Sequence, residues 1–144
     1  MPTHTPTPES AVREAIARRN AAVSAKDAAA VMATGDADFV SYSLAPPLQN
    51  TGGEAGLKGW FSTWDGPIGL EAPDLTVVAG DDVAFACGLF RMTGRKTDGD
   101  TPDLWFRQTF GLRRRGEAWK IVHEHSSLPF LMDGSFKVAV DLKP

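Results

Sequence analysis

The sequence predicts an α+β fold in which three N-terminal helices pack on a strongly curved antiparallel sheet. Apolar residues recur at helical spacing in the first part of the chain, and after Pro67 they alternate with the two-residue period of strands. The strand-like segments are separated by short turn sequences, which is typical of an antiparallel meander. A sheet bent around a helix forms a cone with an internal pocket, and its open mouth suits a small ligand.

Length and composition favour one globular domain with its own core. The chain has 144 residues, of which 42% are apolar and 23% charged. A formal net charge of −3 argues against nucleic acid or a polybasic membrane surface as partner, because both need a cationic face. Cys87 has no second cysteine to pair with, and no apolar stretch reaches the ~20 residues of a membrane span. We therefore expect a cytoplasmic protein without nucleic-acid or membrane partners.

Two helices are predicted near the start of the chain, after a proline-rich arm. Residues 1–8 contain three prolines and little to bury, so we expect a flexible arm there and a single domain over residues 9–144. Apolar residues at helical spacing predict a helix over Ser10–Lys26. The segment Ala28–Ala33 predicts a second, short helix, which Gly35 would end in the left-handed conformation.

A third helix is predicted after Thr51. Thr51 and Glu54 have the spacing of a capping box, in which the two residues satisfy each other's free backbone N–H groups. The large apolar residues that follow fall on one helical face: Leu57, Trp60, Phe61 and Trp64.

Five strands complete the predicted fold. The first covers Phe39–Leu44 and is stopped by Pro46 and Pro47, since proline cannot donate to a strand ladder. The other four are predicted over Leu70–Val78, Val83–Thr93, Asp103–Arg113 and Trp119–Phe130.

The pairing of the last two strands decides which side chains enter the cone. A two-residue turn at Arg115-Gly116 would place Arg107 opposite Glu124. The same register pairs Trp105 with Ser126. Opposite charges directly across a ladder are favourable, which supports this register. A turn longer by one residue would reverse the two faces relative to each other.

Arg107 and Glu124 are the candidate catalytic residues. Inside a cone, Glu124 would transfer a proton and Arg107 would stabilise developing negative charge. The alternative is a partly exposed cross-strand ion pair worth less than ~1 kcal/mol. The candidate ligand-binding residues are aromatic walls and polar groups: Tyr42, Trp60, Trp64, Arg91, Trp105 and Ser126. Tryptophans at helical spacing are also consistent with a packed core.

His123 and His125 are secondary candidates. Both lie on one face of the last strand, a spacing that can serve a metal. The only other histidine, His4, is in the arm. A carboxylate could serve as the third ligand, but none is marked by its spacing, so we expect no metal and no cofactor. Packing at a sheet or subunit interface is the favoured role, and a proton-transfer role in a pocket stays open.

Three segments carry a resemblance to a known superfamily: Gly53–Leu57, Trp105–Thr109 (WFRQT) and Trp119–Ser127 (WKIVHEHSS). Together with the order helix, helix, strand, helix and meander, they resemble the nuclear transport factor 2-like (NTF2-like) superfamily, whose cone-shaped fold is cystatin-like. The resemblance covers roughly residues 9–130 and is strongest to bacterial SnoaL-like and ketosteroid isomerase-like domains.

The resemblance also implies roles for individual residues. In isomerases and cyclases of this superfamily, an acidic residue at the end of the first strand abstracts the proton, and Ser43 stands at the matching position here. Ligand-binding relatives place arginines inside the cone, and Arg91 matches one such position. The relatives also turn the face of Glu124 inward and that of the histidines outward, and they commonly form dimers through the open sheet face.

Two functional classes follow from these observations. The first is a small-molecule-binding SnoaL-like domain, and the sequence leaves open whether it is an enzyme. As an enzyme, it would be a cofactor-independent isomerase, cyclase or dehydratase that transfers protons on a small apolar or carboxylate-bearing ligand. The second class is a non-catalytic dimerisation or association domain. In both cases we expect a homodimer.

Overall fold

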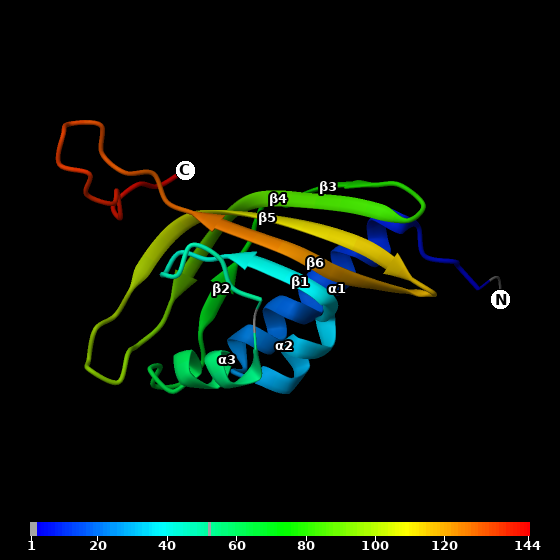
Figure 1. Ribbon diagram of the computed structural model, residues 1–144, viewed down its shortest axis with the longest axis horizontal. Helices are drawn as coiled ribbons and strands as arrows, with labels where there is room; N and C mark the ends of the chain where they lie inside the picture. Colours follow the sequence, from blue (N-terminus) through cyan, green and yellow to red (C-terminus); the bar gives the residue numbers. More distant parts are fainter. Residues whose placement is uncertain (1–2, 52) are drawn as a thin grey trace.

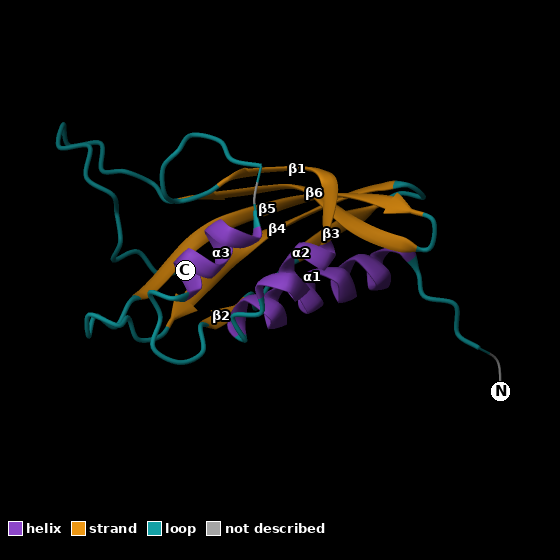
Figure 2. Ribbon diagram, turned by 60° about the horizontal axis from the view of Figure 1, so that its bottom comes forward, coloured by secondary structure: helices purple, strands orange, loops and turns teal. Residues whose placement is uncertain are grey.

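Three helices cover one face of a curved six-stranded sheet in the computed structural model, which describes residues 3–51 and 53–144 (Figures 1 and 2). The helices are α1 (Pro8–Ser24), α2 (Ala28–Thr34) and α3 (Glu54–Phe61). The strands are β1 (Gly35–Tyr42), β2 (Gly69–Glu71), β3 (Thr76–Ala79), β4 (Val83–Thr93), β5 (Asp103–Arg115) and β6 (Ala118–Ser127). The predicted α+β class is confirmed. None of the described helices is long and apolar enough to cross a membrane.

Capping side chains explain where the first two helices begin. The Thr7 hydroxyl accepts a hydrogen bond from the Ser10 backbone N–H at 3.1 Å, and Asp27 accepts one from Ala30 at 3.0 Å. The predicted left-handed end of α2 is wrong, because Gly35 has a φ of −90° and enters β1 directly. Residues 1–2 of the predicted arm lie outside the described residues.

The predicted start of α3 is also wrong. Its cap is Gly53, with a φ of 148° and no side-chain cap, so Thr51 and Glu54 do not form a capping box. Gly52, between them, lies outside the described residues. The helix ends at Phe61, and Trp64 is nevertheless 97% buried beside Phe61 and Ile68 in a small apolar cluster.

The sheet is mixed rather than wholly antiparallel. Its order is β1-β6-β5-β4-β2, with β3 also paired to β4, and β1 runs parallel to β6. The segment predicted as one strand, Leu70–Val78, forms two strands that pair with different parts of β4. Pro73 separates them, because it has no N–H for a ladder.

The main core lies between α1 and the inner face of the sheet (Figure 2). Fully buried residues there come from the helix and from three strands: Val12, Ile16, Phe90, Phe110, Leu112 and Ile121. Burial on this scale stabilises by roughly 1.5–3 kcal/mol for each large side chain.

A bulge in β6 determines which residues of this strand share a face with those of β5. The turn is Gly116-Glu117, since Arg115 pairs with Ala118. Leu112 pairs with Ile121 but Gly111 pairs with His123, so Val122 is an extra residue in β6. One extra residue reverses the alternation that follows it.

The predicted register is therefore wrong. Glu124 pairs with Phe110 and Ser126 with Gln108, on the face that meets the helices. Arg107 pairs with Ser127, on the opposite face, which we call the outer face. The inward direction of Glu124, implied by the family resemblance, is confirmed.

Candidate functional site

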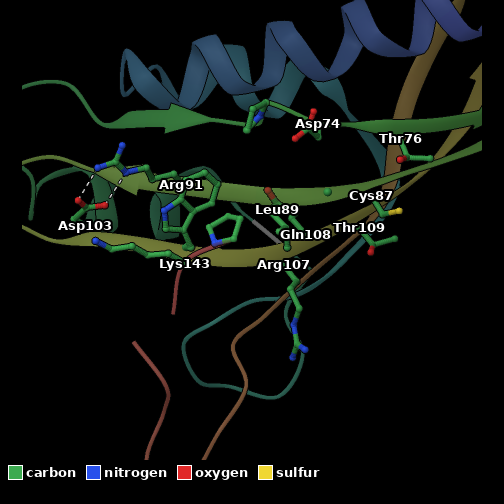
Figure 3. A pocket seen from close by; sticks show the side chains of 14 residues that line it. Asp74, Thr76, Cys87, Leu89, Arg91, Asp103, Arg107, Gln108, Thr109 and Lys143 are labelled. Carbon is green, nitrogen blue, oxygen red and sulfur yellow. Dashed lines mark hydrogen bonds and ion pairs between the residues drawn. The ribbon is translucent and has the colours of Figure 1, made fainter. Parts of the chain in front are cut away.

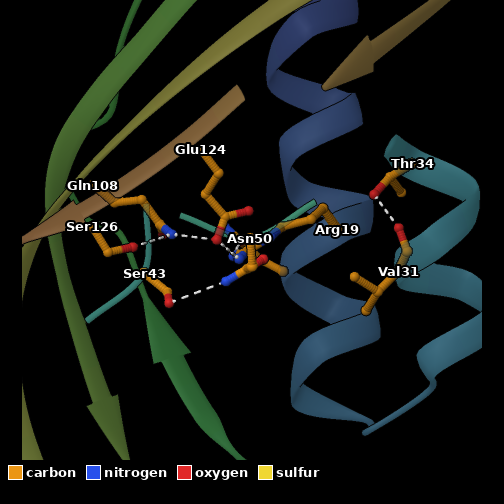
Figure 4. A network of polar contacts seen from close by, with 9 residues as sticks. Arg19, Val31, Thr34, Ser43, Asn50, Gln108, Glu124 and Ser126 are labelled. Carbon is orange, nitrogen blue, oxygen red and sulfur yellow. Dashed lines mark hydrogen bonds and ion pairs between the residues drawn. The ribbon is translucent and has the colours of Figure 1, made fainter. Parts of the chain in front are cut away.

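A buried ion pair lies between α1 and the inner face of the sheet. Arg19 Nη2 donates to Glu124 Oε1 at 2.6 Å, and the two side chains are only 11% and 15% exposed (Figure 4). A buried charge is tolerated when it is paired and hydrogen-bonded. The pair is therefore mostly, but not completely, shielded from solvent.

Gln108 joins the ion pair to β5. Its Nε2 donates to Glu124 Oε1 and to Ser126 Oγ, both at 3.0 Å. This orientation of the amide is fixed by the carboxylate, because an ionised carboxylate only accepts hydrogen bonds. We call Arg19, Gln108, Glu124 and Ser126 the inner network.

Two polar atoms of the inner network have no partner among the described residues. They are Arg19 Nε and Gln108 Oε1, both inaccessible to solvent. The rest of the Arg19 guanidinium is engaged, since Nη1 donates to Asn20 Oδ1 at 3.1 Å and the group lies 5.2 Å from the centre of the Phe110 ring. An unsatisfied buried polar group costs about 1–3 kcal/mol, so the network carries unused hydrogen-bonding capacity.

The loop after β1 lies beside the inner network (Figure 4). Backbone hydrogen bonds of 2.8 and 3.0 Å between Ser41 and Asn50 hold this loop against the end of the strand. Asn50 Nδ2 lies 3.5 Å from Ser43 Oγ, near the network. Ser43, the residue at the position of the superfamily's acid, offers a hydroxyl here, which donates to the Ala45 carbonyl oxygen at 3.1 Å.

The chemistry of the inner network centres on Glu124. Arg19 and Gln108 both donate to Oε1 of this carboxylate, and no described residue donates to Oε2. Oε2 can therefore accept a hydrogen bond or a proton from another molecule. The guanidinium of Arg19 supplies positive charge next to it.

Three predicted site residues lie on the outer face instead. Arg91 forms a bidentate ion pair with Asp103 at 2.7 and 2.8 Å, which raises the pKa of Arg91 and lowers that of Asp103. The Arg91 guanidinium lies 6.0 Å from the centre of the Trp105 ring. Arg107 is exposed, and its Nε donates to Ser127 Oγ at 3.0 Å.

These residues line an outer groove of about 770 Å³, together with Cys87, Leu89 and Lys143 (Figure 3). The expected Arg107–Glu124 pair is wrong, because the β6 bulge turns Glu124 to the inner face while Arg107 lies on the outer face. The expected position of Arg91 inside the cone is also wrong, because Arg91 lies on the face of β4 opposite to the buried Phe90.

The predicted aromatic wall is not assembled. Trp60 and Trp64 pack at the end of α3, where Lys96 Nζ lies 4.0 Å from the Trp64 ring centre. Trp105 is on the outer face, and Tyr42 is at the end of β1. Of the two tryptophans at helical spacing, Trp64 belongs to a packed cluster, whereas Trp60 is 36% exposed.

His123 and His125 point to the outer face, as the resemblance implied. His123 Nδ1 lies 2.8 Å from the Val40 carbonyl oxygen, and both imidazoles make edge contacts with the Tyr42 ring. His125 and Tyr42 also line a second groove of about 790 Å³ with residues 43–49. Within residues 3–51 and 53–144, no three histidine, cysteine or acidic side chains are grouped to hold a metal.

Sequence reasoning missed Arg19 and Gln108, although each carried a signal. Arg19 continues the apolar stripe of α1, which runs through Val12, Ile16 and Val23 at spacings of four, three and four. Gln108 is a polar residue on the otherwise apolar face of β5 between Phe106 and Phe110. A charged or amide residue at a core position needs a buried partner.

Comparisons with known proteins agree with this architecture. The family model described as SnoaL-like domain matches residues 12–131. An NTF2-like protein of unknown function from Pseudomonas putida KT2440 is 34% identical, with a TM-score of 0.84, over 94% of this chain and 96% of that one. No curated protein matches the chain.

More distant solved structures share the fold. A ketosteroid isomerase-like protein from Erwinia carotovora atroseptica SCRI1043 is 19% identical, with a TM-score of 0.69, over 85% of this chain and 97% of that one. The association domain of CaMKII from C. elegans is 18% identical, with a TM-score of 0.61, over 83% and 97%. With a family model that spans most of its length, the chain belongs to the SnoaL-like family of NTF2-like, cystatin-like folds.

Proposed function

We propose that this chain binds a small, mainly apolar molecule between the helices and the inner face of the sheet, with the polar group of the ligand at the inner network. The observation that carries the proposal is the buried Arg19–Glu124 pair with unpartnered atoms beside it. Unpaired donors and acceptors beside a charged pair can hydrogen-bond the polar group of a ligand, and a few such groups in an apolar setting are typical of small-molecule sites.

The neighbours of the inner network suit an apolar ligand body. Leu104 and Phe106 share the inner face of β5 with Gln108, because side chains two residues apart point the same way. Leu128 follows Ser126 with the same spacing and packs against the core. Polar groups at one end of an apolar surface orient a ligand as well as bind it.

We also propose that Glu124 exchanges a proton with the bound molecule, in an isomerase-, cyclase- or dehydratase-type reaction without a cofactor. Ser43 has no carboxylate and cannot act as the base. Glu124 Oε2 is a carboxylate oxygen to which no described residue donates a hydrogen bond. Arg19 would stabilise negative charge that develops on the substrate during proton transfer.

Binding to uncharged aromatic and alicyclic compounds, measured by ligand-observed NMR and calorimetry, tests the proposal. Glu124→Gln keeps the shape of the side chain and is expected to weaken binding by about tenfold or more. Glu14→Gln is the matched control, since Glu14 is 67% exposed in a surface pair with Arg18. If a ligand binds both variants with the same affinity, Glu124 is not part of its binding site.

A second proposal is that two copies of the chain associate through the outer face. Several apolar side chains there are about half exposed: Val78 (52%), Val83 (61%), Phe85 (47%) and Leu89 (44%). An exposed apolar patch of this kind is typical of a protein interface. The oligomeric state in solution tests this proposal.

A further inference from the structure

We infer that the polar group recognised by the inner network is uncharged and both donates and accepts hydrogen bonds, as a primary amide or a hydroxy-ketone does. A carboxylate does not fit. This inference rests on the proposed function, because it names the class of ligand for that same site.

The charge balance of the inner network argues against an anion. Glu124 already neutralises Arg19 at 2.6 Å. The other described contacts of the pair are uncharged, namely Asn20, Gln108 and the Phe110 ring. A ligand carboxylate would therefore enter a neutral, mostly buried site beside the Glu124 carboxylate, and an uncompensated buried charge is costly.

The remaining hydrogen-bonding capacity requires both donors and acceptors on the ligand. Two network atoms can only accept, Gln108 Oε1 and Glu124 Oε2, because the amide oxygen and the ionised carboxylate carry no proton. Arg19 Nε can only donate. The Ser126 hydroxyl already accepts from Gln108, so its proton is available to donate.

A ligand that only accepts leaves the two acceptor atoms without partners. A carboxylate or a simple ketone is of this kind, and it could use only Arg19 Nε and Ser126. A primary amide or a hydroxy-ketone can serve both sets of atoms at once. Satisfying a buried polar atom that is otherwise orphaned recovers the cost of leaving it unpaired.

Three probes that share one ring separate these classes: benzamide, benzoate and acetophenone. Their affinities for the full chain are measured by calorimetry and saturation-transfer NMR at millimolar concentration. We expect benzamide to bind about tenfold more tightly than either of the others. Gln108→Met, which removes the amide oxygen, is expected to abolish most of this preference. Gln49→Met, at an exposed loop position, is expected to retain it.

Glu124→Gln gives a readout that general structural damage does not produce. Neutralising Glu124 leaves the charge of Arg19 uncompensated, so benzoate is expected to gain at least about tenfold in affinity relative to benzamide. This reversal of selectivity, with the benzamide preference of the wild-type chain, supports the inference.

Different outcomes would overturn the ligand class inferred here and the proposed function on which it rests. Benzoate binding more tightly than benzamide to the wild-type chain, with affinities that respond to Glu124→Gln, would overturn the ligand class and leave the site in place. Binding of none of the three probes, or affinities indifferent to Glu124→Gln, would overturn the proposed function together with the inference.

Discussion

Arg19 and Glu124 form an ion pair in the interior of the protein. They lie 105 positions apart in the sequence and meet because α1 crosses the inner face of β6. A buried pair adds little net stability over apolar residues of the same size, but the loss of one partner leaves a buried charge. At the scale of single residues, the pair therefore constrains stability in addition to the binding role that we propose for it.

Arg19→Met is expected to lower the free energy of unfolding by about 3–5 kcal/mol, because Glu124 loses its partner. Arg18→Met is the matched control on the same helix and is expected to cost less than ~1 kcal/mol, since Arg18 is 58% exposed. Urea denaturation measures both. The double variant Arg19→Met/Glu124→Leu is expected to recover most of the stability and to lose binding. Additive losses in the double variant would contradict the buried pair.

The contacts of Asp36 with Arg115 predict that the stability of the fold depends on pH. Hydrogen bonds from Arg115, at 3.0 and 3.1 Å, and from the Asp38 N–H lower the pKa of Asp36 below its usual value. A carboxyl whose pKa is lower in the folded state stabilises the fold above its unfolded pKa of ~3.9. That contribution is lost as the pH falls through the folded value.

Asp36→Asn is therefore expected to lower the unfolding midpoint at neutral pH, with a difference from wild type that shrinks at acidic pH. Asp38→Asn, at a side chain that is 83% exposed and 3.9 Å from Arg115, is expected to have a smaller effect. Thermal unfolding over a pH series measures both. A difference that grows on acidification would contradict this assignment.

At the scale of elements, the bulge at Val122 determines which residues of β6 serve the interior. Before it, Trp119 and Ile121 face the helices, and after it Glu124 does. Without the extra residue, His123 would take the inward position opposite Phe110. The bulge thus places a carboxylate rather than an imidazole next to Arg19.

The loop between β4 and β5 docks on the end of α3, and Gly94 makes this contact possible. A Cβ at Gly94 would lie 2.8 Å from Trp64 Cζ3, whereas one at Gly99 would meet nothing within 4 Å. Both glycines have positive φ, at 154° and 92°, so backbone strain alone does not distinguish them. Only Gly94 faces a buried ring.

Gly94→Ala is expected to cost about 1–3 kcal/mol more in unfolding free energy than Gly99→Ala, because the added methyl overpacks the Trp64 site. Chemical denaturation of the two variants gives the comparison. Equal losses would mean that the contact with Trp64 relaxes without cost.

For the whole molecule, the two faces of the sheet have separate tasks in our proposals. The inner face carries the polar network under the helices, and the outer face carries apolar side chains and the grooved surface around Arg91 and Trp105. Binding and association can therefore be altered independently.

Phe85→Lys is expected to convert a wild-type dimer to a monomer, because it puts a charge in the centre of the outer apolar patch. Leu48→Lys is the control, at a loop side chain that is 97% exposed away from that patch. Sedimentation velocity at micromolar concentration measures the mass of each. A wild-type monomer, or a dimer that survives Phe85→Lys unchanged, would contradict association through this face.

The amino-acid sequence by itself determined the α+β class, the order of the elements and the family. The predicted bounds of β4, Val83–Thr93, are confirmed as well, because apolar alternation and flanking turn residues are local signals. The family resemblance rested on short segments of the same kind.

Only the tertiary structure decided the site. A one-residue bulge is invisible to alternation, yet it turned Glu124 toward the helices while Arg107 stayed on the outer face. The partner of Glu124 came from a helix more than a hundred residues away, and a side chain's distant partner is fixed by packing rather than by its sequence neighbours. Local patterns specify elements, whereas a site depends on how those elements meet.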